Sequence, residues 1–179
     1  MIEIRALRES DDRGSFESGD AELDRFFRQF AGQNQFRHYL GVTYVAVDGQ
    51  DILGFATVAP AHVEIDRLPD AVRRRLPDYP LPVLRLARLA VDRSAQGQGL
   101  GVQLLRYVLR LALEMADSYG CVGVIVDAKP DAIAFYAKYG FVALEAVEGG
   151  SDARPAPTPM FLSIRAIRDA AVQSSRKRR

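Results

Sequence analysis

The feature that most constrains the fold is a single pattern that runs from Leu84 to Met115. An apolar run rich in Leu, Ala and Val ends at Asp92, and after a short loop residues 96–101 read Gln-Gly-Gln-Gly-Leu-Gly. Apolar residues then recur at helical spacing as far as Met115. This order predicts a buried strand, a glycine-rich turn and a long helix. A second strand over residues 122–127 is expected to pair in parallel with the first, in a right-handed βαβ unit.

The turn has the chemistry of an anion site. Gly97, Gly99 and Gly101 have no Cβ, so the backbone can turn tightly and approach a ligand closely. The helix that follows begins with N–H groups that have no partner, at the positive end of its dipole. We therefore expect a phosphate or pyrophosphate here, and a glycine-rich surface turn is the alternative. The Gly-Lys-Ser/Thr ending of a nucleotide-triphosphate loop is absent, and the G-x-G-x-G spacing differs from the dinucleotide G-x-G-x-x-G.

Whole-chain properties narrow the class of protein. The 179 residues suit one globular domain with a sizeable core. No apolar run reaches the roughly 18 residues of a transmembrane helix, and the charged N-terminus lacks the apolar core of a signal peptide. The single cysteine, Cys121, permits no internal disulfide and favours a reducing cytoplasm. It begins an apolar run, which favours a core position over reactive chemistry.

Charge is unevenly distributed along the chain. The net charge is +1, but residues 67–110 hold nine Lys and Arg against three Asp and Glu. This basic block also contains the glycine turn, and its field would attract a polyanion such as coenzyme A or RNA. An arginine-rich solvated surface is the alternative interpretation.

Periodicity and turn residues predict the other elements. Asp20 is expected to cap a helix whose Phe26, Phe27 and Phe30 form an apolar stripe, more typical of a core than of a ligand-binding face. Residues 1–165 are expected to form the domain, and residues 166–179 a basic, disordered tail. Strands are expected at residues 2–7, 42–47, 52–59, 84–92, 122–127, 141–144 and 160–165, helices at residues 20–36, 66–76, 99–117 and 130–139, and a Gly/Pro-rich loop at residues 148–159.

Two motifs in order resemble those of GNAT acyltransferases. Gln96, Gly99 and Gly101 match a Q/R-x-x-G-x-G/A turn, and Ala134-Phe135-Tyr136-Ala137-Lys138-Tyr139-Gly140-Phe141 is similar to the family's FYxxxGF segment. The resemblance covers residues 1–165. It implies an α/β (α+β) GNAT fold, in which a central mixed, mostly antiparallel sheet contains a parallel βαβ pair and carries helices on both faces. It also implies acetyl-CoA as acyl donor, and a first helix that borders the acceptor cleft.

A narrower resemblance points to the GNAT toxins of bacterial toxin–antitoxin pairs. The segments that carry it include Phe16-Glu17-Ser18-Gly19, Leu23-Asp24-Arg25-Phe26, Thr43-Tyr44-Val45, Tyr79-Pro80-Leu81-Pro82-Val83, residues 86–92 and Val126-Asp127-Ala128-Lys129. It implies a cytoplasmic enzyme that acetylates the amino group of aminoacyl-tRNA and so blocks translation. It further implies neutralisation by a ribbon-helix-helix antitoxin, a homodimer and no membrane association.

The resemblance assigns roles residue by residue. Tyr136 matches the general acid that protonates the leaving coenzyme A thiolate, and a core tyrosine is the alternative. Tyr139 is assigned to packing or surface. The pantetheine arm is expected along the backbone of Leu89, Ala90 and Val91, and the pyrophosphate at the amides of Gln98, Gly99, Leu100, Gly101 and Val102, with Gln96 and Gly97 shaping the approach.

A general base is harder to assign. The strand over residues 84–91 contains no Asp or Glu, but it offers Arg85 and Arg88. A lysine amine, with a pKa of about 10.4, would need deprotonation, whereas an α-amine of pKa about 8 is already partly neutral. Such a site suits an α-amine on a phosphate-bearing acceptor, for which Arg73, Arg74, Arg75, Arg85 and Arg88 are the candidate contacts. No metal is expected.

Two other functions fit the same motifs. The first is a housekeeping N-acetyltransferase of small amines or protein N-termini. The second is a coenzyme A-binding module without catalysis. The identity of the aminoacyl group is left open.

Overall fold

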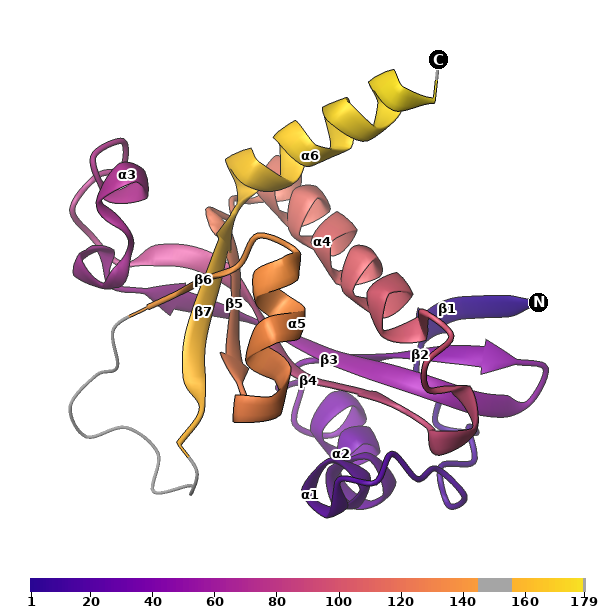
Figure 1. Cartoon of the computed structure of the whole chain (residues 1–179). Coiled ribbons are helices and arrows are strands. Elements are labelled where there is room, and N and C mark those ends of the chain that lie inside the picture. The colour runs from indigo at the N-terminus through magenta and orange to yellow at the C-terminus, as the bar shows by residue number, and fades with distance from the viewer. Residues whose placement is uncertain (145–155, 179) are drawn as a thin grey trace. The chain divides into compact units, whose positions relative to one another are not determined.

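The computed structural model describes residues 1–144 and 156–178 (Figure 1). The chain forms two compact units. Unit 1 consists of Met1–Ala59 and Leu86–Arg110, and unit 2 consists of Pro60–Arg85 and Leu111–Arg179. Because two strands and the long helix run through both units, each unit is built from segments far apart in the sequence.

The strands form one seven-stranded mixed sheet in the order β1-β2-β3-β4-β5-β7-β6. The pairs β1–β2, β2–β3, β5–β7 and β6–β7 are antiparallel, and β4–β5 is the parallel pair. The predicted mixed sheet with a parallel pair is therefore confirmed. The strands are β1 (Ile2–Ala6), β2 (Val42–Asp48), β3 (Asp51–Val63), β4 (Leu81–Val91), β5 (Gly123–Ala128), β6 (Val142–Ala143) and β7 (Thr158–Ser163).

The helices follow the expected order with three differences in detail. The first helix contains a π-helical stretch, Phe26–Phe30, between two α-helical parts. The segment expected at residues 66–76 is a 3₁₀ turn, Ile65–Arg67, and one short helix. The segment from Pro130 begins with a 3₁₀ turn, Pro130–Ala132, before its α-helix. The helices are α1 (Ala21–Arg25), α2 (Ala31–Phe36), α3 (Asp70–Arg73), α4 (Leu100–Ser118), α5 (Ile133–Lys138) and α6 (Ile164–Lys177).

In unit 1 an aromatic cluster joins the first helix to the sheet. The predicted cap is confirmed, because the Asp20 carboxylate accepts from the N–H groups of Glu22 and Leu23. Phe27 stacks on Phe55 of β3 with ring centroids 4.4 Å apart, and Phe16 meets both rings edge-on. Such aromatic pairs stabilise a core beyond the area that they bury. Of the predicted stripe, Phe26 and Phe27 are buried, whereas Phe30 is exposed and lies under the Arg25 guanidinium.

The opposite face of the same sheet carries the start of α4. Neighbouring residues of a strand point to opposite faces, so Gly54 faces away from the Phe55 cluster. A Cβ on Gly54 would lie 2.9 Å from Leu104 Cδ1 and 3.1 Å from the Ala90 carbonyl oxygen. Leu104 is fully buried. The missing side chain at Gly54 therefore allows α4 to pack close to β3, which gives unit 1 helices on both faces of its strands.

Unit 2 is organised around β5, β7 and a second apolar cluster. Its members include Val63, Leu81, Val83, Ile125 and Phe161, all buried. Cys121 is buried as expected. At the close approach of β5 and β7, a Cβ on Gly123 would lie 2.4 Å from the Phe161 ring and 2.5 Å from the Leu162 carbonyl oxygen.

The C-terminal segment differs from the sequence-based expectation. Residues 166–177, expected to be disordered, lie in α6, which follows β7 directly (Figure 1). The Ser163 hydroxyl caps this helix by accepting from the Ala166 N–H, and Ile167 on its first turns is buried. Local capping and one apolar anchor outweigh the basic composition. The loop expected at residues 148–159 lies largely outside the described residues.

Two further properties concern the described part of the chain. Within residues 1–144 and 156–178, no helix is both long and apolar enough to cross a bilayer. The same residues contain no cluster of His, Cys, Asp and Glu that could hold a metal ion.

We predict that both close-approach glycines are required for stability and that their effects differ in size. Gly123→Ala should cost more than Gly54→Ala, because its Cβ would lie only 2.5 Å from a backbone carbonyl oxygen, which cannot move aside. At Gly54 the nearest atom is the end of the Leu104 side chain at 2.9 Å, and the backbone oxygen of Ala90 lies farther away, at 3.1 Å. Overpacking of this kind costs about 1–3 kcal/mol, and we expect Gly54→Ala near the lower end. Urea denaturation of the two variants checks the order, and equal or reversed losses would contradict it.

Candidate active site

The glycine turn lies in unit 1 and joins β4 to α4. Gly97 and Gly99 adopt φ values of +75° and +82°, which L side chains rarely adopt. A Cβ at either position would meet nothing within 4 Å, so backbone conformation rather than crowding favours glycine there. Gly101 lies inside α4 and is not among the residues with positive φ. The predicted conformational reason therefore holds for two of the three glycines.

The backbone donors after the turn are free of helical partners. The first intrahelical bond runs from the Gln103 N–H to the Gly99 carbonyl, at 3.2 Å. The N–H groups of residues 100–102 precede it and have no carbonyl one turn earlier in the helix. At the N-terminus of a 19-residue helix, these donors and the helix dipole form an anion-binding arrangement.

Asp92 fixes the entry to the turn. Its carboxylate accepts from the Glu17 N–H at 2.9 Å and from the N–H and hydroxyl of Ser94 at 3.0 and 2.7 Å. Partial burial alone would raise the pKa of this carboxyl, but the three hydrogen bonds outweigh it and hold the pKa below the ordinary aspartate value. The Asp92 N–H in turn donates to the Leu53 carbonyl at 2.8 Å. Leu53 lies where the β2–β3 register shifts between Ala46 and Val47, and such bulges often lie beside active sites.

Gln96 braces the other side of the turn. Its Nε2 donates to the Ser18 carbonyl at 2.7 Å and to the Val91 carbonyl at 3.0 Å. The side chain that matches the family motif is therefore engaged with the protein's own backbone. Of the three residues expected to border the pantetheine arm, Ala90 is buried and Leu89 and Val91 are half-buried at the end of β4.

Arg88 has an unusual environment within unit 1. Its Cζ lies 3.7 Å from the centroid of the Phe26 ring, and the side chain is half-buried. Desolvation by burial lowers the pKa of the guanidinium, and the charge of Glu22 opposes this. Within residues 1–144 and 156–178, no hydrogen bond or ion pair engages the Arg88 guanidinium. A desolvated cation with unused donors is a candidate contact for an anionic ligand.

Tyr136, the predicted general acid, lies on α5 in unit 2. It is 5% exposed and makes edge-on contacts with Phe135 and Phe141, at centroid distances of 5.1 and 5.4 Å. Burial in these apolar surroundings raises the pKa of the phenol to about 12. No described residue hydrogen-bonds its hydroxyl. The phenol is therefore protonated at neutral pH, and its proton is not donated to any acceptor among the described residues. Tyr139 is half-buried and packs on Phe135, as expected.

The remaining candidate arginines have different environments. Arg85 donates to Asp127 of β5 at 2.6 Å, and the two side chains form a partly exposed ion pair within unit 2. Arg73 pairs with Asp70 at 2.7 Å on α3, and Arg74 and Arg75 are exposed. Of the five candidate arginines, two, Arg73 and Arg85, therefore form ion pairs with described carboxylates. The pairing of Arg85 with Asp127 spans two strands, so no local sequence signal reveals it.

We predict that Asp92→Asn destabilises the protein in a pH-dependent way. A carboxyl whose folded pKa is depressed contributes stability above its unfolded pKa, and this contribution is lost as the pH falls through the folded pKa. The loss at pH 7 should be about 1 kcal/mol, typical of a cap, and should shrink toward zero below about pH 4. Thermal unfolding of both proteins from pH 7 to pH 3 measures this difference. A difference that stays constant across that range would show that the carboxylate charge is not responsible.

Comparisons with known proteins bear on the identity of this site. The family model described as an acetyltransferase (GNAT) domain matches residues 40–143. A tRNA-acetylating toxin of Mycobacterium tuberculosis (strain ATCC 25618 / H37Rv) is 39% identical over 138 residues, which cover 76% of this chain and 82% of that protein.

Solved structures agree on the fold. The crystal structure of a mutant of KacT matches with a TM-score of 0.82 and 26% identity, covering 94% of this chain and 98% of that one. A mutant of the AtaT toxin, bound to the C-terminus of the antitoxin AtaR and to acetyl-CoA, matches with a TM-score of 0.75 and 23% identity. This match covers 93% of this chain and 96% of that one. The family model matches more than half of the chain, and the glycine turn and the free donors of α4 agree with it. The chain therefore belongs to the GNAT family of acetyltransferases.

Proposed function

We propose that this protein is an acetyl-CoA-dependent N-acetyltransferase that acetylates the α-amino group of aminoacyl-tRNA and thereby stops translation. The observation that carries the proposal is the 39% identity with a tRNA-acetylating toxin over three quarters of the chain. The braced turn with its free helix donors supports the donor side, and the environment of Arg88 supports the acceptor side.

The residues of the turn fit the diphosphate of the acyl donor. Positive φ at Gly97 and Gly99 exposes the main chain, and no built Cβ would fill the space beside it. The amides of residues 98–102 would hold the pyrophosphate, and the backbone of residues 89–91 would run beside the pantetheine arm. When bound, acetyl-CoA supplies an acetyl group activated as a thioester.

Tyr136 would supply the proton that the leaving sulfur requires. The α-amine attacks the thioester carbonyl, so a C–N bond forms, the C–S bond breaks and the sulfur takes the phenolic proton. The phenol then regains a proton from the nitrogen, which loses one on becoming an amide. Because the phenol stays protonated across the physiological range, it can act as an acid but not as the base that prepares the amine.

The acceptor side requires no carboxylate base on β4. An α-amine with a pKa near 8 has an appreciable neutral fraction at neutral pH, unlike a lysine side chain. Arg88 lies against Phe26 of the first helix, the element that borders the acceptor in GNAT enzymes. No described residue forms a hydrogen bond or an ion pair with its guanidinium. We assign it to a phosphate of the acceptor, because a guanidinium can bind phosphate oxygens through paired hydrogen bonds.

The biological setting is part of the same proposal. A protein that blocks translation needs a neutralising partner, and AtaT is bound by the C-terminus of its antitoxin. We assign the present protein a ribbon-helix-helix antitoxin, a homodimeric state and a cytoplasmic location. Light scattering of the purified protein tests the dimer, and co-expression with the neighbouring gene product tests neutralisation.

The function is tested by incubating the protein with radiolabelled acetyl-CoA and charged bacterial tRNA. The proposal expects label on the aminoacyl group, which is released with the amino acid by mild alkali. Transfer to small amines or protein N-termini but to no charged tRNA would instead favour a housekeeping acetyltransferase. Binding of acetyl-CoA without any transfer would favour a non-catalytic module.

We predict that Tyr136→Phe lowers kcat by about a hundredfold or more, in line with loss of a general acid. Its Kd for acetyl-CoA should stay within about twofold, since the phenol is assigned to the chemical step. Stability should change little, because no described residue bonds the hydroxyl. The control is Tyr139→Phe, which should keep its activity. If Tyr136 only packs in the core, Tyr136→Phe and Tyr139→Phe should be equally active.

We predict that Arg88→Gln raises KM for aminoacyl-tRNA by about tenfold or more, the effect of losing a charge-assisted hydrogen bond. The Kd for acetyl-CoA should not change. An aminoacyl ester without phosphate should be acetylated equally by wild type and variant. Phe26→Leu, which keeps an apolar side chain but removes the ring face, should act in the same direction and more weakly. Equal losses on both acceptors would contradict a phosphate contact.

A further inference from the structure

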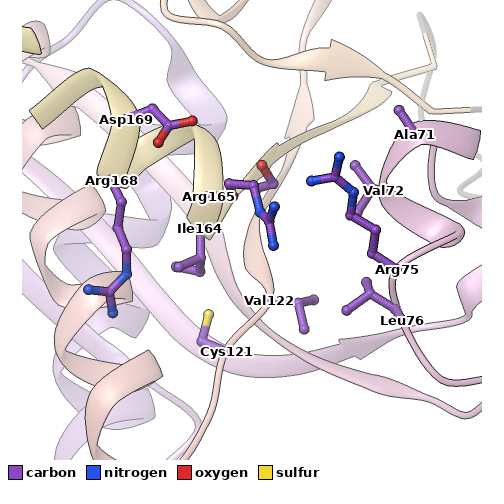
Figure 2. Close-up of a pocket in the computed structure, with 11 residues that line it drawn as sticks. Ala71, Val72, Arg75, Leu76, Cys121, Val122, Ile164, Arg165, Arg168 and Asp169 are labelled. Atoms are coloured by element: carbon purple, nitrogen blue, oxygen red, sulfur yellow. The ribbon is translucent and has the colours of Figure 1, made fainter. Parts of the chain in front are cut away.

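Unit 2 contains a cavity of about 450 Å³ that the proposed reaction does not use. It lies between the segment around α3, the approach to β5 and the start of α6 (Figure 2). Its volume falls within the range typical of small-molecule sites, roughly 300–1,000 Å³. None of the residues assigned to acetyl-CoA or to the general acid lines it.

The inner wall of the cavity is apolar and well anchored. Val72, Leu76 and Val122 line it and pack against the buried cluster of unit 2, and the buried Cys121 lines it beside Val122. The Ile164 N–H donates to the Val122 carbonyl at 3.0 Å, and the Val122 N–H donates to the Pro82 carbonyl at 2.8 Å. These main-chain bonds hold the approach to β5 and the start of α6 together, so the part of the wall around Val122 and Ile164 is pre-formed.

The opening of the cavity is cationic. Figure 2 shows the Arg75 and Arg165 side chains reaching it from opposite sides, one from the turn after α3 and the other from the first turn of α6. No carboxylate among the described residues forms an ion pair with either guanidinium. Arg168 differs, because it donates to Asp117 of α4 at 2.6 Å.

A third charge at the opening has the opposite sign. Asp169 also lines the cavity, one helical turn after Arg165. At a spacing of four residues on a helix, its carboxylate partly offsets the field of that arginine. Among the described residues the charge at the opening is still positive, since the guanidinium groups of Arg75 and Arg165 face one carboxylate.

From this arrangement we propose that the cavity is a second ligand site, for an organic carboxylate that carries an aromatic or branched aliphatic body. The body would lie on Val72, Leu76 and Val122, and the carboxylate would accept hydrogen bonds from Arg75 and Arg165. A planar guanidinium matches a carboxylate in two-point geometry. The proposed function assigns the acceptor phosphate to Arg88 and not to Arg75, so this second site does not depend on acetyl transfer and is tested separately from it.

The test is a titration of the ¹⁵N-labelled full-length protein with 4-phenylbutyrate, followed by amide chemical shifts. We expect a Kd of about 1 mM or lower, with the largest shifts around residues 72–76, 121–122 and 164–165. The matched neutral probe is 4-phenylbutan-1-ol, which should bind about tenfold more weakly because it loses the charge-assisted bonds. Equal affinity of acid and alcohol, shifts at other residues, or no binding of the acid would overturn the proposal.

Substitutions of opposite sign sharpen the test. Arg165→Gln and Arg75→Gln should each weaken binding of the acid by about tenfold, and Asp169→Asn should strengthen it. The exposed neighbour Arg74, which does not line the cavity, provides the control Arg74→Gln, with unchanged affinity. If Arg74→Gln weakens binding as much as Arg75→Gln, the attraction is a general effect of charge and the site is refuted. If the protein binds an acidic peptide but not the small acid, the cavity is a peptide-docking groove and the proposal is likewise refuted.

Discussion

The structure of unit 1 depends on how the turn before α4 is attached to the short segment Phe16–Ser18. Asp92 accepts from the Glu17 N–H, the Arg93 N–H donates to the Glu17 carbonyl, and Gln96 donates to the Ser18 carbonyl. The segment is held in turn by the first helix. The buried Asp24 accepts from the N–H and hydroxyl of Ser18, and Arg28 Nε donates to the Phe16 carbonyl at 2.9 Å. Asp24 is the buried polar member of this set, and a buried carboxylate is costly unless it is paired, so loss of its bonds to Ser18 would leave it with that cost.

This attachment couples two functions that lie far apart in the sequence. On one side of the segment are the free donors of α4 and the two left-handed glycines, and on the other is the helix that carries Phe26 beneath Arg88. Phe16 itself is buried and meets the stacked Phe27 and Phe55 rings edge-on, so the attachment is anchored in the core as well as in hydrogen bonds. A shift of the first helix would therefore be transmitted to the turn through the segment Phe16–Ser18. The connections are hydrogen bonds between side chains and main chain, together with the main-chain bond from the Arg93 N–H to the Glu17 carbonyl.

Sequence reasoning predicted those features whose cause is local. The strand, turn and helix around Asp92, the cap at Asp20 and the order of elements all follow from periodicity, glycine and capping residues. Contacts across the sheet could not be predicted in this way, and Arg85–Asp127 and Arg88–Phe26 are examples. The π-helical stretch Phe26–Phe30 was not predicted either, because the spacing of the phenylalanines fits an α-helix as well as a π-helix. The helix over residues 166–177 was missed because basic composition was given more weight than the Ser163 cap and Ile167. The roles of Tyr136 and the pyrophosphate donors remain predictions from family resemblance.

The burial of Tyr136 bears on how such an acid can work. A phenol with a pKa of about 12 would be a poor proton donor to a thiolate of pKa about 8.5 in water. Desolvation penalises every anion, however, so surroundings that raise the pKa of the phenol would also raise that of a thiolate released beside it. The two proton affinities would then approach each other only in an apolar site. On this argument the edge-on contacts of Phe135 and Phe141 do more than support α5, because they exclude the water that would stabilise the thiolate and remove its need for a proton.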